Sequence, residues 1–561
     1  MKNIYLDIIE KTLAAYSDTA LDQEIERFTK VVAENLKTEH DFHRIAVNIA
    51  LLNSVGRRMD LYPRMLRMMD LCFEGRIRVP DFTVRELAPI LDVLEKSGLV
   101  EQERLEQWKA VLAAFDPFEE YRIRTWTMPP EWKCTNIPAF NSAGEAARCG
   151  YLGLDATPFI DRQLERLMPS LDENGMFKDK SGYHVYDLVT RSHLCQILAS
   201  GYAGKYRAEI DEKLKKAGLL TLKMQSVTGE IPFGGRSIQF LHNEGLLCIV
   251  MEYEAVRYAR LGDGETAGKF KAAAQKAAQY ILRTLEENPT HHNKNYYEDL
   301  QIGCEGYAFF NKYMVTLASW CYTAYLFADD SIVPTVAPAD EGGYFARTSP
   351  KFHTAFANAG GYFLEWDLDA RDMVLYDANG LGRIHHRDCP SALLLSVPFS
   401  AEPRYHQEGK NPRPMSLCGY LELEEFGALC GADVPAKYML VSYEEHPDRV
   451  VVTLDADQKN NFIIRENYVI SENGIEITLG AYGDGFFLPV LDFDGKEKTV
   501  IEESDGSITA RYKGCFARYT FEGEPLGYEL YYNRNGRYRV YKVKTKAVHV
   551  EMGKEQADAS I

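Results

Sequence analysis

Apolar residues recur at helical spacing over the first 330 residues of the chain. In the segment 270–287, Ala, Ile and Leu return every three or four positions and would form one apolar helix face. Loops of polar residues separate such segments. The predicted helices span residues 3–15, 20–37, 41–55, 61–73, 84–97, 102–115, 140–153, 158–168, 187–202, 206–221, 243–261, 265–287 and 308–327.

The connections between these helices favour a closed ring over an open superhelix. Helical hairpins that each bury one face can form either. A superhelix would carry a sequence repeat of about 30 to 50 residues, and the chain has none. Long loops rich in aromatic and charged residues occupy 121–139, 172–186, 227–242 and 288–307. Such loops would decorate the mouth of a ring, so we predict an (α/α)6-type helical toroid of about twelve helices.

The hydrophobic period changes to two after a break rich in Pro and Gly at 333–344. Segments such as RVVVTLDADQ alternate apolar and polar residues between turn residues. This alternation is typical of antiparallel sheets packed face to face. We therefore predict two domains packed together, a toroid over 1–335 and an antiparallel β-sandwich over 336–561.

Charge and composition narrow the class of partner. The formal net charge is -18, and such a surface repels nucleic acid and anionic lipid. No apolar run is long enough to span a membrane, and the N-terminus lacks a signal-peptide pattern. Eleven Cys occur without a C-x-x-C pair, which indicates buried thiols in a reducing compartment. We expect a cytoplasmic protein, and homo-oligomerisation stays open.

Polar side chains crowd the segment 234–244, just before an apolar helix. Arg236 can grip a carboxylate with two hydrogen bonds, and Glu244 can act as acid, base or nucleophile. Gln239 and His242 would lie at the same helix start, where free N–H groups favour negative ligands. The alternative is plain capping, in which Asn243 and Glu244 satisfy the first turn and Arg236 pairs with Glu244.

Tyrosines and carboxylates interleave before the last predicted helix. Tyr297, Asp299, Glu305 and Tyr307 are the candidates in this stretch. Aromatic rings stack on the CH faces of sugars, while carboxylates bind hydroxyls or transfer protons. The pattern is what a glycan-binding cleft requires, although a Tyr-rich packing layer with solvated acids would look the same.

Two further regions add candidate groups. Asn141, His184 and Tyr186 lie at helix starts in the same half of successive hairpins, so a closed ring would bring them to one mouth; Asn141 is also an ordinary N-cap residue type. In the β-domain, a predicted turn carries Arg383 with the adjacent pair 385–386. That turn can lean over the toroid mouth, or it is a surface loop or domain-interface patch.

Common catalytic and metal motifs are missing from the sequence. It contains no G-x-x-x-x-G-K-[ST], no H-E-x-x-H and no G-x-S-x-G. The HHNK segment at 291–294 has no third ligand at regular spacing. We therefore expect neither a metal nor another cofactor.

An all-α part of about 330 residues followed by antiparallel β resembles the (α/α)-toroid carbohydrate-active enzymes, more distantly those of the heparinase and alginate-lyase type. In motif, the chain is similar to the family of domain of unknown function 2264, associated with glycoside hydrolase family 154. The similarity lies in the turn 235–237 before a toroid helix and the Tyr-rich segment 307–327. It implies β-glucuronidase activity.

The toroid lyases usually carry adjacent Asn and His on one helix, a Tyr acid and a His from the β-domain. Asn141 is followed by Ser142 here, which departs from that pattern. Tyr186 and either His385 or His386 can still fill the other two roles.

The leading hypothesis is therefore a glycoside hydrolase acting on uronic-acid-containing oligosaccharides. One of Glu244, Asp299 and Glu305 would be the acid and another the base or nucleophile. The first alternative is a lyase that cleaves uronate linkages by β-elimination, and the second is a non-catalytic glycan-binding protein. We predict that one pocket at the toroid mouth is lined by Arg236, His242, Glu244, Asp299, Glu305 and Tyr307.

Overall fold

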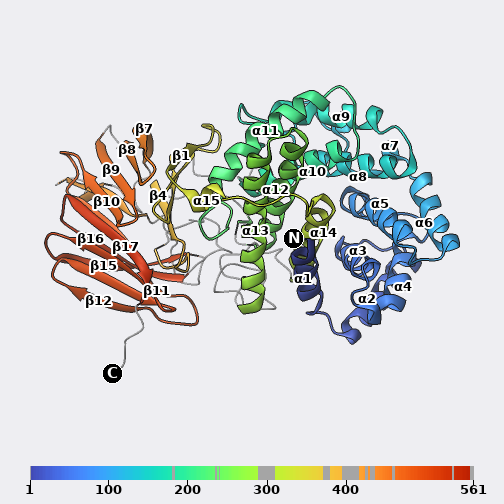
Figure 1. Cartoon of the computed structure of the whole chain (residues 1–561), viewed down its shortest axis with the longest axis horizontal. Helices are drawn as coiled ribbons and strands as arrows, with labels where there is room; N and C mark the ends of the chain where they lie inside the picture. The colour runs from blue at the N-terminus through green and yellow to red at the C-terminus, as the bar shows by residue number, and fades with distance from the viewer. Residues whose placement is uncertain are drawn as a thin grey trace.

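The computed structural model describes residues 2–179, 184–233, 237–238, 240–287, 310–369, 380–394, 416–423, 427–429, 436–457, 462–533 and 536–555. Helices occupy one half of the molecule and strands the other (Figure 1). This order confirms the predicted fold class, a helical toroid followed by antiparallel sheets.

The described helices include a closed inner ring. Each ring helix packs against the next, and the last packs back against the first. Their apolar faces contribute to one large buried core. The six ring helices are α3 (Asp41–Ser54), α5 (Pro80–Ser97), α8 (Ile137–Leu152), α10 (His184–Ala199), α12 (His242–Arg260) and α14 (Phe310–Phe327).

A second layer of helices packs outside the ring. Local signals set its boundaries, as where Ser17 accepts a hydrogen bond from Ala20 N at 3.2 Å at the start of α2. Every predicted helix overlaps an observed one. The outer helices are α1 (Lys2–Leu13), α2 (Asp18–Ala33), α4 (Tyr62–Phe73), α6 (Gln102–Ala114), α9 (Thr157–Leu167), α11 (Arg207–Met224) and α13 (Gly264–Glu287). Short helical turns are η1 (Met59–Leu61), α7 (Pro117–Glu120), η2 (Thr125–Thr127), η3 (Met168–Ser170) and α15 (Pro338–Glu341).

The strands in the described part of the chain form three antiparallel sheets. A four-stranded sheet next to the helices has the order β1 (Tyr344–Arg347), β2 (Thr354–Ala359), β3 (Tyr362–Asp367) and β4 (Gly380–His386). An eight-stranded sheet has the order β12 (Val500–Ser504), β13 (Ser507–Tyr512), β14 (Cys515–Phe521), β17 (Ala547–Lys554), β10 (Gly474–Leu479), β9 (Ile463–Ser471), β8 (Arg449–Asp457) and β7 (Lys437–Glu445). A five-stranded sheet has the order β15 (Pro525–Asn533), β16 (Gly536–Val543), β11 (Gly485–Phe493), β5 (Cys418–Leu423) and β6 (Gly427–Leu429).

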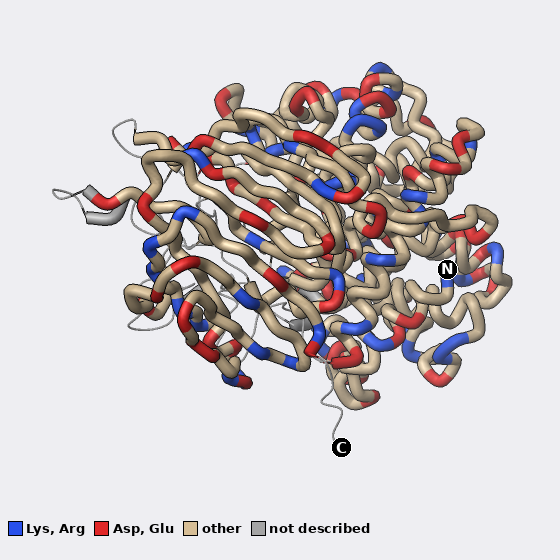
Figure 2. The backbone as a smooth tube through the Cα atoms, turned by 60° about the vertical axis from the view of Figure 1, so that its left-hand side comes forward, with Lys and Arg blue, Asp and Glu red and all other residues tan. Residues whose placement is uncertain are grey.

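Strand β8 shows why the alternating pattern produces sheets. Its residues alternate between buried and more exposed positions, so Val450, Val452, Leu454 and Ala456 enter the strand core while the polar side chains remain outside. Figure 2 shows Lys or Arg and Asp or Glu residues interspersed along the strands. None of the described helices is both long and apolar enough to cross a bilayer.

The helical and strand parts meet at an apolar cluster. Met176, Met224 and Val227 from the helical side pack against Phe352 and Phe356 from the strand side. Helix α14 ends at residue 327 and strand β1 begins at residue 344. The division into two domains near residue 335 stays a prediction.

One local prediction is wrong. The segment containing Arg383 and His385 is the strand β4, not a turn. It pairs along its length with β3, and this pairing buries most of the segment. Alternation along a strand sends Arg383 and His385 to one face and His386 to the other.

Candidate active site

The loop of residues 226–233 connects α11 to α12 and lies between the helices and strand β4. Its turn is closed by hydrogen bonds from Gly229 N to Ser226 O at 3.0 Å and from Glu230 N to Ser226 Oγ at 3.1 Å. Gly229 has φ of +100°, and a Cβ there would lie 2.7 Å from Lys276 O. The glycine thus fixes a turn that presents Thr228 and Glu230.

Helix α12 supports this loop from the toroid side. Glu244, in the first turn and 0% exposed, accepts a hydrogen bond from Ile231 N at 3.2 Å. Asn243 Nδ2 donates to Ser237 O at 2.7 Å. The His242 ring stacks on Phe240 with 5.6 Å between ring centroids. These contacts are not the predicted capping, because Glu244 and Asn243 bind the backbone of the preceding segment and no described side chain caps α12 at its N-cap residue Leu241.

Strand β4 supports the loop from the other side. Arg383 Nη2 donates to Ile231 O and to Glu365 Oε1, each at 2.7 Å. Glu365 Oε2 accepts from Phe233 N at 3.0 Å. Arg383 Nη1 also lies 3.8 Å from Glu230 Oε1. One buried guanidinium therefore ties the loop to two strands of the β-part.

His385 completes the arrangement. Its Nδ1 lies 3.2 Å from Thr228 Oγ1 and 3.9 Å from Glu230 Oε2. Thr228 Oγ1 in turn donates to Glu230 Oε2 at 2.7 Å. We call this set the junction cluster, and its members are Thr228, Glu230, Glu244, Glu365, Arg383 and His385.

The junction cluster concentrates negative charge in a buried place. Burial raises the pKa of Glu365, although Arg383 acts in the opposite sense. Burial lowers the pKa of Arg383, but Glu365 and Glu230 outweigh it and the net pKa is raised. Arg383 is shared by Glu365 and Glu230, and burial outweighs its effect on Glu365, so the surroundings of Glu365 favour the protonated form. A carboxyl group whose pKa is raised by burial is suited to general acid catalysis.

His184 also lies at the junction of helices and strands. It is 1% exposed, its ring stacks on Phe352 at 5.6 Å, and its Nε2 lies 3.4 Å from Thr354 Oγ1. Burial lowers its pKa to about 3, so the ring is neutral at physiological pH. It lines a small gap together with Asp187 and Ile231, which brings it next to the 226–233 loop.

Three other candidates make contacts outside the junction cluster. Asn141 uses its Nδ2 to hold Ile123 O at 2.6 Å, which secures a loop of the toroid. Tyr186 is half-buried and packs against the helical core. His386 lies on the opposite face of β4, where its ring contacts Tyr362 at 4.8 Å. The roles predicted for these three residues in one shared site stay predictions.

Six of the predicted site residues are not in the described part of the chain. The predicted single pocket of Arg236, His242, Glu244, Asp299, Glu305 and Tyr307 therefore stays a prediction. Lying outside the described residues are Arg236, Gln239, Tyr297, Asp299, Glu305 and Tyr307.

Sequence reasoning missed Glu230 and Glu365. Glu365 interrupts the apolar run of β3, a strand that is buried along its length. A charge in a buried strand needs a partner, so the isolated Glu in this apolar run could have been identified from the sequence as a candidate. Glu230 lies only a few residues before the polar segment at 234–244, but its link to β4 spans 152 residues of sequence, as the Ile231–Arg383 bond shows. Among the described residues, no group of three or more His, Cys, Asp or Glu is arranged to hold a metal ion.

Comparison with known proteins gives structural similarities only. No protein-family model matches the chain, and no curated protein matches its sequence. Heparinase III is 9% identical, with 92% of this chain and 78% of that chain covered and a TM-score of 0.47. A xanthan lyase from Paenibacillus is 10% identical, with 100% and 60% covered and a TM-score of 0.46. Chondroitin AC lyase from Streptomyces coelicolor is 11% identical, with 99% and 83% covered and a TM-score of 0.44. The resemblance to the domain 2264 family stays a prediction.

Proposed function

We propose that the protein is an enzyme that cleaves glycosidic bonds in uronic-acid-containing oligosaccharides, with its catalytic centre at the junction cluster. The observation that carries the proposal is the meeting of buried Glu230 and Glu365 with Arg383 and His385, beside the loop that buried Glu244 holds from the start of α12. Such a set is costly to bury for structure alone, because taking several charges out of water disfavours folding even when the charges are paired.

Hydrolysis is the reaction we favour. A glycoside hydrolase needs one carboxylic acid to protonate the leaving oxygen and one carboxylate to activate water or attack the sugar. Glu244 is proposed as the acid, and Glu230, which precedes the residue that Glu244 contacts, as the base or nucleophile. Asp299 and Glu305 lie outside the described residues and remain candidates for the second role.

Arg383 is proposed as a positioning residue. Its guanidinium already binds Glu365 and Ile231 O, and it lies beside Glu230. It therefore sets the place of the loop that carries Glu230. Arg236 remains the proposed partner for the uronate carboxylate, because a guanidinium binds carboxylate with two parallel hydrogen bonds.

Elimination is the second candidate reaction, and the surroundings of His385 support it. An imidazole beside a carboxylate and a hydroxyl is oriented as a base, and β-elimination begins with removal of the C5 proton of a uronate. The distances of 3.2 Å to Thr228 Oγ1 and 3.9 Å to Glu230 Oε2 fit that role. The two reactions use the same cluster but leave different products.

A screen of uronate-capped oligosaccharides tests both reactions. Hydrolysis releases reducing ends without new absorbance, whereas elimination gives an unsaturated product that absorbs at about 235 nm in addition to new ends. For hydrolysis, Glu244→Gln is expected to lower kcat by about 100-fold or more, because the side chain keeps its size but loses its proton. Glu265→Gln, at an exposed position on α13, is the matched control.

Variants at Glu244 and His385 also distinguish hydrolysis from elimination. Under elimination, His385→Gln abolishes the product that absorbs, and Glu244→Gln keeps most of it. If Glu244→Gln and Glu230→Gln both keep near-native turnover, the hydrolase proposal is wrong. If neither product forms from any substrate in the screen, the protein binds glycans without cleaving them.

A further inference from the structure

A large cavity opens at the far end of the toroid from the junction cluster. Its volume is about 940 Å³, and its walls come from the C-terminal turns of the ring helices, such as Ser97 of α5, Ala199 of α10 and Arg260 of α12. The junction cluster lies instead at the N-terminal end of α12. We call this space the rear cavity, and nothing in the proposed reaction uses it.

The rear cavity is basic in a chain that is acidic overall. Seven Lys and Arg side chains line it against two Asp, while the net charge of the whole chain is -18. Both acids are already paired, Asp92 with Lys96 at 2.6 Å and Asp211 with Lys215 at 3.3 Å. Arg85 and Arg257 are also paired, with Glu86 and Glu254, which leaves Lys2, Arg207 and Arg260 to give the cavity a positive potential that draws in anions.

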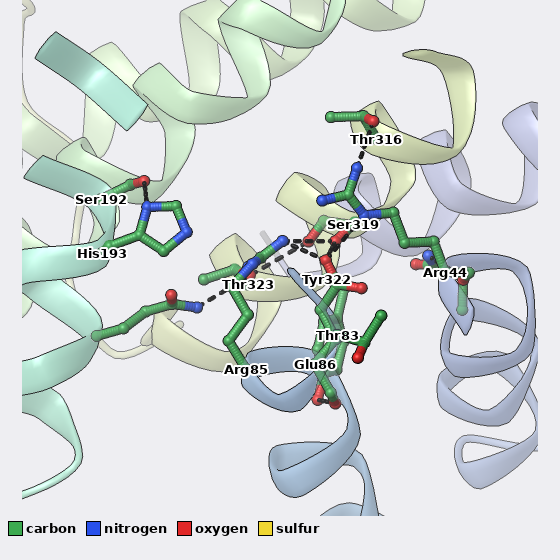
Figure 3. A network of polar contacts seen from close by, with 12 residues as sticks. Arg44, Thr83, Arg85, Glu86, Ser192, His193, Thr316, Ser319, Tyr322 and Thr323 are labelled. Carbon is green, nitrogen blue, oxygen red and sulfur yellow. Dashed lines mark hydrogen bonds and ion pairs between the residues drawn. The ribbon is translucent and has the colours of Figure 1, made fainter. Parts of the chain in front are cut away.

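The floor of the cavity carries a buried guanidinium with spare donors. Arg85 is 2% exposed, and its Nη2 donates to Ser319 Oγ at 3.0 Å and to Glu86 (Figure 3). Its Nε and Nη1 have no hydrogen-bond partner among the described residues, and the same is true of Gln196 Oε1 beside them. Buried donors are normally satisfied, so these atoms call for a polar ligand in the cavity.

Helix ends account for only some of these cations. Arg257 and Arg260 lie in the last turn of α12, where positive charge offsets the exposed carbonyl groups. Arg85, by contrast, lies in the first half of α5. Arg207 is the first residue of α11, where the helix dipole disfavours a cation, and it forms no ion pair with another described residue.

We propose that the rear cavity binds a small carboxylated sugar, of the size of a hexuronate or its disaccharide. Arg85, Arg207 and Arg260 would hold the carboxylate, since guanidinium groups bind carboxylates in a planar, paired manner. Tyr253 and Tyr325 in the walls offer ring faces for the CH groups of a sugar. The volume lies within the range of about 300 to 1,000 Å³ that small-molecule sites occupy. The proposal does not depend on the reaction at the junction cluster.

Calorimetric titration of the full chain with D-glucuronate tests this site. The probe variant is Arg207→Ala with Arg260→Ala, because both side chains are exposed on the rim and lie outside the junction cluster. The control is Arg67→Ala with Arg347→Ala, two exposed arginines that do not line the cavity. D-glucose and D-glucose 6-phosphate are titrated in parallel.

The rim variant is expected to bind glucuronate at this site about tenfold more weakly or worse, while the control variant binds as the native protein does. Neutral glucose is expected to bind at least about tenfold more weakly than glucuronate. If the junction cluster also binds uronate, the stoichiometry falls from two to one in the rim variant, and turnover is unchanged. If the proposed function is wrong, the stoichiometry of glucuronate binding falls from one to zero in the rim variant.

Two results would overturn the inference. One is a glucuronate affinity and stoichiometry that are the same in the rim variant as in the native protein. The other is tighter binding of glucose 6-phosphate than of glucuronate, which would assign the cavity to phosphate esters instead.

Discussion

Replacing Glu466 by Gln should change how the stability of the protein depends on pH. Glu466 lies on β9 and is 0% exposed. It accepts hydrogen bonds from Gly419 N at 2.7 Å and from the Tyr468 hydroxyl at 2.6 Å. No Lys or Arg among the described residues forms an ion pair with it. Burial therefore dominates, and it raises the pKa of Glu466 from 4.5 to about 7.

The direction of the pH effect follows from the linkage between protonation of Glu466 and folding. Because the folded-state pKa lies above the unfolded one, the protonated side chain stabilises the fold fully below about pH 4.5, and this contribution is lost as the pH rises through about 7. The difference between 4.5 and about 7 corresponds to about 3 kcal/mol. A neutral Gln cannot ionise, so Glu466→Gln should gain up to about 3 kcal/mol over the native protein at pH 8 and almost nothing at pH 4.5.

Thermal unfolding at pH 4.5, 6 and 8 measures the effect. A gain of about 3 kcal/mol corresponds to a rise in Tm of roughly 6 to 12 °C for a unit of 150 to 250 residues. Glu476→Gln, at an exposed position on β10, is the control and should leave the pH profile unchanged. Other buried groups, such as Glu254, cancel in the comparison because both proteins contain them. Equal Tm values for the native protein and Glu466→Gln at pH 8 would refute the reasoning.

Two more predictions concern the helical part. Glu86→Gln leaves two buried arginines without their shared carboxylate, so it should destabilise the helical part by about 3 to 5 kcal/mol in urea unfolding followed at 222 nm. The control Glu103→Gln, at an exposed position, should change the free energy of unfolding by less than about 0.5 kcal/mol. Equal unfolding midpoints for the two variants would contradict the prediction. Gly175→Ala places a Cβ 2.1 Å from Lys213 O, so it should cost more than about 2 kcal/mol. Gly98→Ala has a similar positive φ but open space, so its cost should stay near 1 kcal/mol, and matching losses at the two glycines would contradict the steric argument.

The helices were predictable because their signals are local. Each predicted helix was identified from the 3.6-residue period of its own apolar residues. In α13, for example, Ala273, Ala277 and Ile281 are all buried. The strand β4 was taken for a turn because Arg383 and His385 look like surface residues, and only their partners on β3 and the 226–233 loop make them buried. Those partners are far away in sequence, so no local sequence pattern predicts the contacts with them.

The candidate site shows the same division. His242 and Glu244 were correctly placed at the start of a helix, because a helix start has a local signature. Glu230 and Glu365 were missed because their roles arise from contacts across 132 to 152 residues of chain. A single sequence indicates which residue types are present, but the meeting of a toroid loop with a distant strand depends on tertiary packing.

The closed ring has a consequence for synthesis on the ribosome. Arg44 on α3 donates a hydrogen bond to Thr316 on α14 at 2.6 Å, and 272 residues separate the two. At roughly 5 to 20 residues per second, the nascent α3 waits about 15 to 50 seconds for the helix that completes its surroundings. During that interval Arg44 can pair with Glu86 on α5, but the side of α3 that packs against α14 has no final partner. The emerging chain is therefore expected to require a holdase chaperone until residue 327 has left the exit tunnel, and premature termination before α14 should yield an aggregating fragment.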